Sequence, residues 1–271
     1  MSVATAVTDA AKALNDLRAA YTTTRNDLYA EISTQVAGKI LFVDGLVGDD
    51  ANDGLSSGKP FRTLAWALWN IRGNTVNRIR LADDQSFDLS HPNGVLGSKN
   101  VSGSTIVIIE RMSAVDGPEP RCQVTLNPTI SGGLYVPPLK IVSHGPLHLA
   151  FDGIDIVAPG RASPGTDWNT ANLRTFAAPA AFKARYGFAL HLHRSSWTGD
   201  ADGIPLWRSA GLIDVNLIRS SFAGTLPPLV DCNAGVINVS GYEVTTTGVN
   251  LISGGNNAVN CPPSMNSFLG I

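Results

Sequence analysis

The clearest hydrophobic pattern in the chain lies between residues 40 and 72. Four apolar residues at 40–43 are followed by Asp44 and Gly45, which predicts a short buried strand that ends in a turn. After an acidic, glycine-rich loop, Pro60 suits the first turn of a helix, where its missing N–H would have no partner. Apolar residues then recur at helical spacing: Phe61, Leu64, Ala65, Leu68 and Ile71. We therefore predict a helix over about 60–72 with one buried face.

Beyond this helix, short apolar runs alternate with Gly, Pro and Asn, a pattern typical of strands separated by turns. The first of these runs lie at 78–81, 105–110, 122–126 and 139–142. Later runs each place one polar residue between two aliphatic ones: Asp155, His191, Asp214 and Asn238. These polar centres are 36, 23 and 24 residues apart. The steps become regular if about 12 residues bulge out at 159–186, and repeats of this length indicate a stacked solenoid.

The first 38 residues carry a different pattern. Small and apolar residues follow alternating steps of three and four, as in the seam of a coiled coil: Val7, Ala10, Leu14, Leu17, Tyr21, Thr24 and Leu28. Gly38 follows where a C-terminal helix cap would lie. We predict a helical stem over 1–38 for oligomerisation and anchoring, followed by a β domain over 39–271. The alternative is a helix packed along the chain's own β domain.

Three strings between residues 42 and 68 resemble the start of the β domain in tail spikes of bacteriophages and related virion spikes. They are FVDG at 42–45, GDDANDGLS at 48–56 and PFRTLAWAL at 60–68. The resemblance implies a mainly β fold, a right-handed single-stranded parallel β-helix of the pectate-lyase-like kind. The helix at 60–72 would cap its open end, since an uncapped stack exposes unpaired backbone and apolar rungs.

This resemblance also implies a function. Members of the family include head or tail spikes of phages and of phage-like gene transfer agents. We expect a spike or fibre on the surface of such a particle, a homo-oligomer and most simply a trimer, whose residues 1–38 bind a capsid or tail protein. The β domain would attach the particle to a polysaccharide of the host surface. Alternatives are a capsular polysaccharide depolymerase, either hydrolase or lyase, and a fibre that binds only other virion proteins. The short β domain favours attachment over cleavage.

Charge, cysteine content and hydropathy narrow the function classes. The chain has 20 Lys and Arg against 22 Asp and Glu, so no basic excess points to nucleic acid or an anionic membrane. Its 3 cysteines are far apart and indicate buried thiols rather than disulfides or a metal site. The first residues lack the pattern of a secretory signal, and no apolar run reaches the roughly 18 residues of a membrane span. We expect synthesis in the bacterial cytoplasm.

The polar centres are the candidates for chemistry. In a stack of strands about 4.8 Å apart they would form one column on the outer face. Asp155 and Asp214 would then flank His191 at roughly 9 to 10 Å from each other, near the upper limit for an inverting glycosidase. A catalytic acid needs burial or a close like charge to keep its proton, and an open sheet face supplies neither. We therefore expect these three catalytic candidates to bind ligand or simply to be solvated.

Aromatic residues near polar turns are candidates for sugar binding, because flat rings stack on sugars, although they also pack on neighbouring coils. They are Trp168, Trp197 and Trp207, and Asn238 joins them from the column. The insertion at 159–186 would fold over the column and carry Trp168 to the ligand.

We expect no metal and no cofactor. Gly54 falls where the third ligand of a calcium loop starting at Asp50 would stand. The acidic loop is therefore expected to be held by Asx turns. Motifs for binding phosphates or dinucleotides, and the nucleophile elbow of hydrolases, do not occur in the sequence.

Overall fold

The computed structural model divides the chain into two units, Met1–Gly38 and Lys39–Ile271. The described residues are 38–90, 97–113, 122–127, 129–131, 134–136, 139–160, 182–184, 187–200, 206–223, 230–247, 252–253 and 258–260. The predicted coiled-coil stem over 1–38 lies outside this part of the chain. Among the described residues, no helix is long and apolar enough to cross a membrane.

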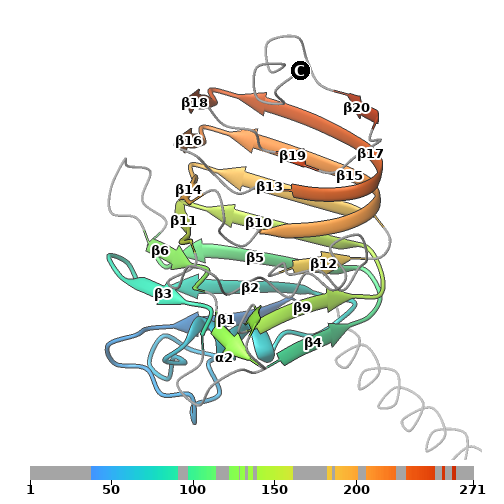
Figure 1. Ribbon diagram of the computed structural model, residues 1–271. Coiled ribbons are helices and arrows are strands. Elements are labelled where there is room, and N and C mark those ends of the chain that lie inside the picture. Colours follow the sequence, from blue (N-terminus) through green and yellow to red (C-terminus); the bar gives the residue numbers. More distant parts are fainter. Residues whose placement is uncertain are drawn as a thin grey trace, which may run out of the picture. The chain divides into compact units, whose positions relative to one another are not determined.

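The described part of Lys39–Ile271 is mainly β, with parallel sheets, as predicted (Figure 1). One series of paired strands, which we call the first stack, contains β1 (Lys39–Val43), β2 (Val76–Leu81), β5 (Thr105–Arg111), β10 (Leu147–Asp152), β13 (Phe188–His193), β15 (Trp207–Ile218), β17 (Val230–Tyr242) and β20 (Ala258–Asn260). The strands expected at 40–43, 78–81 and 105–110 are therefore confirmed.

A second stack pairs the shorter strands that follow those of the first. It contains β3 (Ser86–Asp88), β6 (Cys122–Thr125), β11 (Ile154–Ala158), β14 (Ser196–Gly199), β16 (Ser221–Ala223) and β18 (Thr245–Thr247). The third stack contains β4 (Gly97–Val101), β9 (Leu139–Ser143), β12 (Phe182–Ala184), the first residues of β15 and β17, and β19 (Ile252–Ser253). Within the described residues, only β7 (Thr129–Ser131) and β8 (Leu134–Val136) pair antiparallel.

The chain passes through the third, first and second stacks in turn, as in the series β9, β10, β11 and the series β12, β13, β14. The register of β15 against β17 shifts between Ser209 and Gly211. The first residues of β15 therefore pair within the third stack, and its later residues pair within the first. One prediction is corrected here. β12 falls inside the segment 159–186 that we expected to be an insertion, yet it pairs with β9 and β15.

Apolar side chains from successive strands line up to form the core. In the first stack, Leu149 pairs with Leu190, which pairs with Val215. All three are buried. In the second stack, Ile156 pairs with Trp197, which pairs with Phe222, and these are also buried. Cys122 belongs to the same core, and burial raises the pKa of its thiol to about 12, so it is one of the buried thiols that the sequence predicts.

The corner between the first and second stacks has the same geometry in successive strands. The residue after β10, β13, β15 and β17 has a positive φ in each case: Gly153 (70°), Arg194 (50°), Arg219 (49°) and Glu243 (52°). Non-glycine residues adopt this conformation at a cost. Hydrogen bonds offset it, because the N–H groups of Gly153, Arg194 and Arg219 donate to carbonyls of the next strand at 2.8–3.0 Å. The corner is therefore a repeated, hydrogen-bonded element.

The helix after the acidic loop is shorter than predicted. α2 is Leu64–Trp69 instead of 60–72. Phe61 is held against β1, since its N–H donates to the Phe42 carbonyl and its carbonyl accepts from the Asp44 N–H, both at 2.9 Å. This pairing keeps residue 61 extended, so the helix begins only after Thr63, whose Oγ1 accepts from the Trp66 N–H at 3.2 Å.

The predicted buried face of this helical segment is confirmed. Every member of the set is buried: Phe61, Leu64, Ala65, Leu68 and Ile71. α2 packs against β1, β2 and β3 at the end of the stacks where β1 lies (Figure 1). The buried face of α2 shields apolar side chains at this end of the stacks from water.

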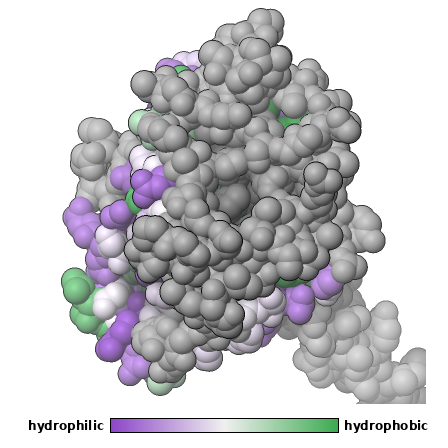
Figure 2. All heavy atoms as spheres, in the orientation of Figure 1, coloured by the Kyte–Doolittle hydropathy of each residue, from purple (hydrophilic) through white to green (hydrophobic). Residues whose placement is uncertain are grey.

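The acidic loop is held by Asx turns, as predicted. The carboxylates of Asp44, Asp49 and Asp53 each accept the backbone N–H two residues further on, at 2.9–3.0 Å. The same loop exposes Leu46 and Val47, which are 80% and 73% accessible. A hydrophobic patch stands out at the lower left of Figure 2, over the loop that follows β1 in Figure 1.

Asp50 joins this loop to the helix, so its removal should destabilise the protein. Its carboxylate accepts from the backbone N–H groups of Arg62 and Thr63 at 2.9 Å and from Thr63 Oγ1 at 2.8 Å. Asp50→Ala is expected to lower the free energy of unfolding by roughly 1–3 kcal/mol, because two backbone donors lose their acceptor. Asp53→Ala, which removes a single exposed Asx bond, should cost only about 0.5 kcal/mol. Urea unfolding measures both.

The same variants test whether the loop binds calcium. Because the Asp50 oxygens already accept three hydrogen bonds, calcium is expected to leave the melting temperature of the wild-type protein unchanged. Within the described residues, no group of three His, Cys, Asp or Glu is placed to hold a metal ion. A rise of several degrees on adding calcium, abolished in Asp50→Ala, would contradict this expectation.

Candidate functional site

The four polar centres do not form one column. Asp155 lies on β11 in the second stack, where it pairs with Gln123 and Ser196. Its Oδ1 accepts from Ser196 Oγ at 2.7 Å. The other three centres lie in the first stack. The corner at Gly153 separates that stack from the second one, to which Asp155 belongs. The predicted ladder that includes Asp155 is therefore wrong, because an apolar–polar–apolar run occurs in strands of both stacks.

Asp214 and Asn238 do lie side by side. They are in register on β15 and β17, and Asn238 Nδ2 donates to Asp214 Oδ1 at 2.8 Å. His191 pairs with Asn216, two residues beyond Asp214, so it lies diagonally from Asp214 on the same outer face. Asp214 and His191 are exposed, and Asn238 is half-buried. These three predicted residues therefore share one accessible surface.

The protonation state of His191 depends on its partial burial and on two neighbouring side chains. Partial burial lowers its pKa, the nearby His148 lowers it further, and Asp214 acts in the opposite direction. The net shift is downward from an ordinary value near 6.5. At pH 7 the ring is neutral and has one donor and one acceptor nitrogen. A neutral imidazole, a carboxylate and an amide on one face can hydrogen-bond hydroxyl groups.

The predicted aromatic binding residues have different outcomes. Trp197 is wholly buried between Ile156 and Phe222, so the prediction that it binds ligand is wrong. Its neighbours Ser196 and Thr198 take the outward positions of the short strand, which turns the indole inward. Trp207 begins β15, and nothing is described of its side chain. Trp168 lies outside the described residues.

A row of charged residues, not predicted from the sequence, lies at the ends of the first-stack strands. Register aligns Arg80, Glu110, Asp152 and His193 on β2, β5, β10 and β13. The Glu110 side chain, 14% exposed, accepts from Arg80 Nε at 3.0 Å and from an Arg78 nitrogen at 3.1 Å. Asp152 accepts from Arg194 at 3.0 Å and lies 3.1 Å from His193 Nδ1. We call Arg80, Glu110, Asp152 and His193 the charged row.

A hollow of about 200 Å³ opens beside the charged row. Its lining, which we call the arginine pocket, consists of Arg78, Arg80, Glu110, Arg111, Met112, Ser113, Asp152 and Arg194. The lining thus includes four arginines and two carboxylates. Arg111 is 7% exposed and packs over Gly153, where a Cβ would come within 3.3 Å of its Cδ and Nε. Glycine at the corner therefore leaves room for this arginine.

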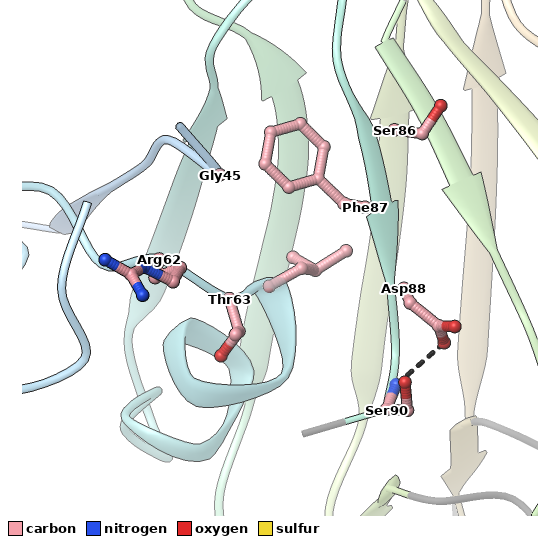
Figure 3. A pocket seen from close by; sticks show the side chains of 8 residues that line it. Gly45, Arg62, Thr63, Ser86, Phe87, Asp88 and Ser90 are labelled. Atoms are coloured by element: carbon pink, nitrogen blue, oxygen red, sulfur yellow. Dashed lines mark hydrogen bonds between the residues drawn. The ribbon is translucent and has the colours of Figure 1, made fainter. Parts of the chain in front are cut away.

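A second hollow, of about 280 Å³, lies between the acidic loop, the start of α2 and β3 (Figure 3). Asp88 turns toward Ser90 and accepts its backbone N–H at 2.8 Å, and it also accepts from the Asn127 amide. Arg62 Nε donates to the Gly48 carbonyl at 2.9 Å. These polar groups join neighbouring segments to one another, so we assign this hollow a structural role.

Comparison with known proteins assigns no family. No family model matches the chain, and no curated protein matches it. Two solved structures of a GH136 lacto-N-biosidase from Eubacterium ramulus, the native protein and a selenomethionine derivative, are similar at 9% identity. They cover 88% and 92% of this chain and 70% and 72% of theirs, with TM-scores of 0.17 and 0.16.

A repeated twelve-residue string could have located part of the charged row in the sequence. Four segments whose first-stack strands are in register have the same layout in the sequence: LHLAFDGIDIVA at 147–158, FALHLHRSSWTG at 188–199, IDVNLIRSSFAG at 213–224 and INVSGYEVTTTG at 237–248. The sixth and seventh positions stand at the corner. They include Asp152, His193 and Arg194, so aligning the whole string places these residues together.

Proposed function

We propose that the chain is a spike or fibre protein of a phage or phage-like particle and that it attaches the particle to a polysaccharide on the host surface. The observation that carries this proposal is the polar outer face of the first stack, where His148, His191, Asp214 and Asn238 adjoin the charged row. On this face Asp214 stands beside Asn238, and His191 stands beside Asn216, which stands beside Ser240, so hydrogen-bonding groups of neighbouring strands lie about 4.8 Å apart. An extended glycan presents hydroxyl groups along a line in the same way.

The fold that we propose for this role is a right-handed, single-stranded parallel β-helix capped by α2. Support comes from the order in which the chain visits the three stacks and from their parallel pairing. Crossovers between parallel strands are right-handed in about 98% of cases. A rigid sheet loses little conformational freedom on binding, so weak contacts with sugar hydroxyls are not offset by ordering of the protein.

Assembly completes the proposal. Residues 1–38 would form a homotrimeric stem that binds a capsid or tail protein and places the β unit on the particle surface. Three copies of one weak glycan site, held together, raise the overall affinity by roughly 10²–10⁴ without any new contact. A trimer would therefore attach firmly even where a single face binds weakly.

A specific observation favours a second function, a polysaccharide depolymerase. Glu110 and Asp152 are directly opposite each other on neighbouring strands at the arginine pocket. Neighbouring strands lie about 4.8 Å apart, and the two carboxyl groups of retaining glycosidases are about 5–5.5 Å apart. This pair replaces Asp155 and Asp214 as the catalytic candidates, since those two lie in different stacks.

One experiment separates these functions. Purified protein is incubated with host capsule, and both retention on the capsule and new reducing ends are measured. We expect retention without cleavage, weakened about tenfold in Asp214→Ala because a charged acceptor and the Asn238 contact are lost. Trp168→Ala tests the predicted stacking residue. Asp155→Asn is the matched control on the second stack and should bind normally.

Two results would contradict the proposal. Absence of retention on capsule and on whole host cells would rule out attachment to a surface glycan. New reducing ends that disappear in both Glu110→Gln and Asp152→Asn would show that the protein is the depolymerase.

A further inference from the structure

We propose that the arginine pocket binds an anionic group of the host polysaccharide, a uronic acid carboxylate or a sulfate ester. This inference rests on the proposed attachment function and names the class of glycan. The lining of the pocket has four arginines and two carboxylates, and a third carboxylate, Asp83, accepts the Ser113 N–H at the rim at 3.3 Å, so one positive charge remains in excess. The chain as a whole carries a net charge of −2. The positive charge is therefore concentrated where the lining is concave and screening by water and salt is weaker.

Arg78 and Arg80 have donors to spare. Each gives one nitrogen to Glu110, and Arg80 also lies 5.9 Å from the centre of the Phe42 ring. A guanidinium has five N–H donors in a planar fork that matches a carboxylate or sulfate. No other hydrogen-bond partner of these two arginines occurs in the described part of the chain. Their side chains are 44% and 34% exposed, so the remaining donors are accessible.

Glu110 orients the two arginines without cancelling them. Its single negative charge is shared between two guanidinium groups, which stand two residues apart on the outer face of β2. On the far side of the pocket, Asp152 holds Arg194 in the same way. Each carboxylate therefore limits the movement of an arginine and reduces the entropy lost when an anion binds.

The pocket also connects with the polar face. Arg78 belongs to the register row that continues through Ile108 and Ala150 to His191. An acidic sugar in the pocket would therefore place the following sugars over His191 and Asp214. A charged anchor with neutral contacts beyond it fits an acidic polysaccharide better than an isolated small anion.

The test measures binding by calorimetry with the full chain. The probes are an oligogalacturonate, a sulfated oligosaccharide and a neutral oligosaccharide of the same length, each at low and at high salt. We expect the acidic probes to bind more tightly than the neutral one and to weaken as salt rises. The carboxylate and sulfate arms show which anion is preferred. Arg78→Gln should weaken acidic binding about tenfold or more, because it removes a charge-assisted fork.

Matched variants separate recognition from folding. Arg219→Gln removes an arginine that is paired with Glu243 at 2.9 Å and lies outside the pocket, so it should bind like the wild type. Arg78→Lys keeps the charge but loses the planar fork of donors. Its affinity for the acidic probes should lie between that of Arg78→Gln and that of the wild type. Thermal unfolding of each variant is expected to match the wild type. Equal affinities of Arg78→Gln and Arg219→Gln, or a neutral probe that binds as tightly as the acidic ones, would overturn the inference.

Capsule experiments separate this inference from the proposed function. If carboxyl-reduced, desulfated capsule retains the protein as well as native capsule does, anion recognition is wrong while attachment stands. If no capsule or cell retains the protein but oligogalacturonate binds and Arg78→Gln abolishes that binding, the pocket is supported and the attachment function is wrong.

Discussion

Trp197→Ala is expected to lower the free energy of unfolding by about 3–5 kcal/mol, in the range found for large aromatic side chains removed from a core. The indole is wholly buried and stands in the second stack between Ile156 and Phe222. Each of those neighbours would lose contacts on one side, and strands that are hydrogen-bonded above and below cannot collapse into the space. The loss of stability has two parts: the favourable burial of the indole is lost, and a cavity is left in the core.

Urea unfolding followed by circular dichroism measures this effect. Trp66→Ala is the matched control, because Trp66 is only partly buried at the edge of the core and should cost about 1–2 kcal/mol. Glycan retention of correctly folded Trp197→Ala should equal that of the wild type. A variant with unchanged stability and lost retention would instead place the indole in the binding site.

Deletion of residues 1–38 is expected to abolish incorporation into the particle and to convert the oligomer to a monomer. The β unit should remain folded, because Lys39–Ile271 is a compact unit of its own with a hydrophobic core cluster. Light scattering measures the oligomer, and a particle-binding assay measures incorporation. Loss of three-site binding should also weaken retention on capsule by roughly 10²–10⁴.

A chain truncated by three residues, lacking 2–4, provides the control for shortening the N-terminus and should incorporate normally. Incorporation of the long deletion at the wild-type level would show that anchoring resides in Lys39–Ile271. A long deletion that stays oligomeric would show that the β unit itself associates.

Features that depend on neighbouring residues could be predicted from the sequence. The strand at 40–43, the buried face of the segment at 61–71 and the Asx turns of the acidic loop each depend on side-chain periodicity or on hydrogen bonds across two residues. The predicted start of the helix was wrong, because the pairing of Phe61 with Phe42 is a contact between segments. Local spacing therefore determined which face is buried, but tertiary pairing determined where the helix begins.

The candidate site was predicted only in part. Asp214, Asn238 and His191 do share a face, because the step of 24 between the first two equals their true register. Asp155 was placed in the wrong stack, and Trp197 was assigned to the surface, because a three-residue pattern does not record on which side of a corner a strand lies. Of the arginines of the pocket, only Arg194 belongs to the repeated twelve-residue string, and Arg78, Arg80 and Arg111 lie outside it.

By itself the sequence determined that this protein is built from short β segments with one buried face each, and only the tertiary structure decided which segments are neighbours. Residues in register on adjacent first-stack strands are separated by 42 positions for Glu110 and Asp152 but by 24 for Asp214 and Asn238. Closing a longer connection costs little, since each doubling of its length adds only about 0.6 kcal/mol. The length of chain between strands is therefore nearly free to vary, and Arg80 and Glu110 join Asp152 and His193 in the charged row only when the strands are stacked.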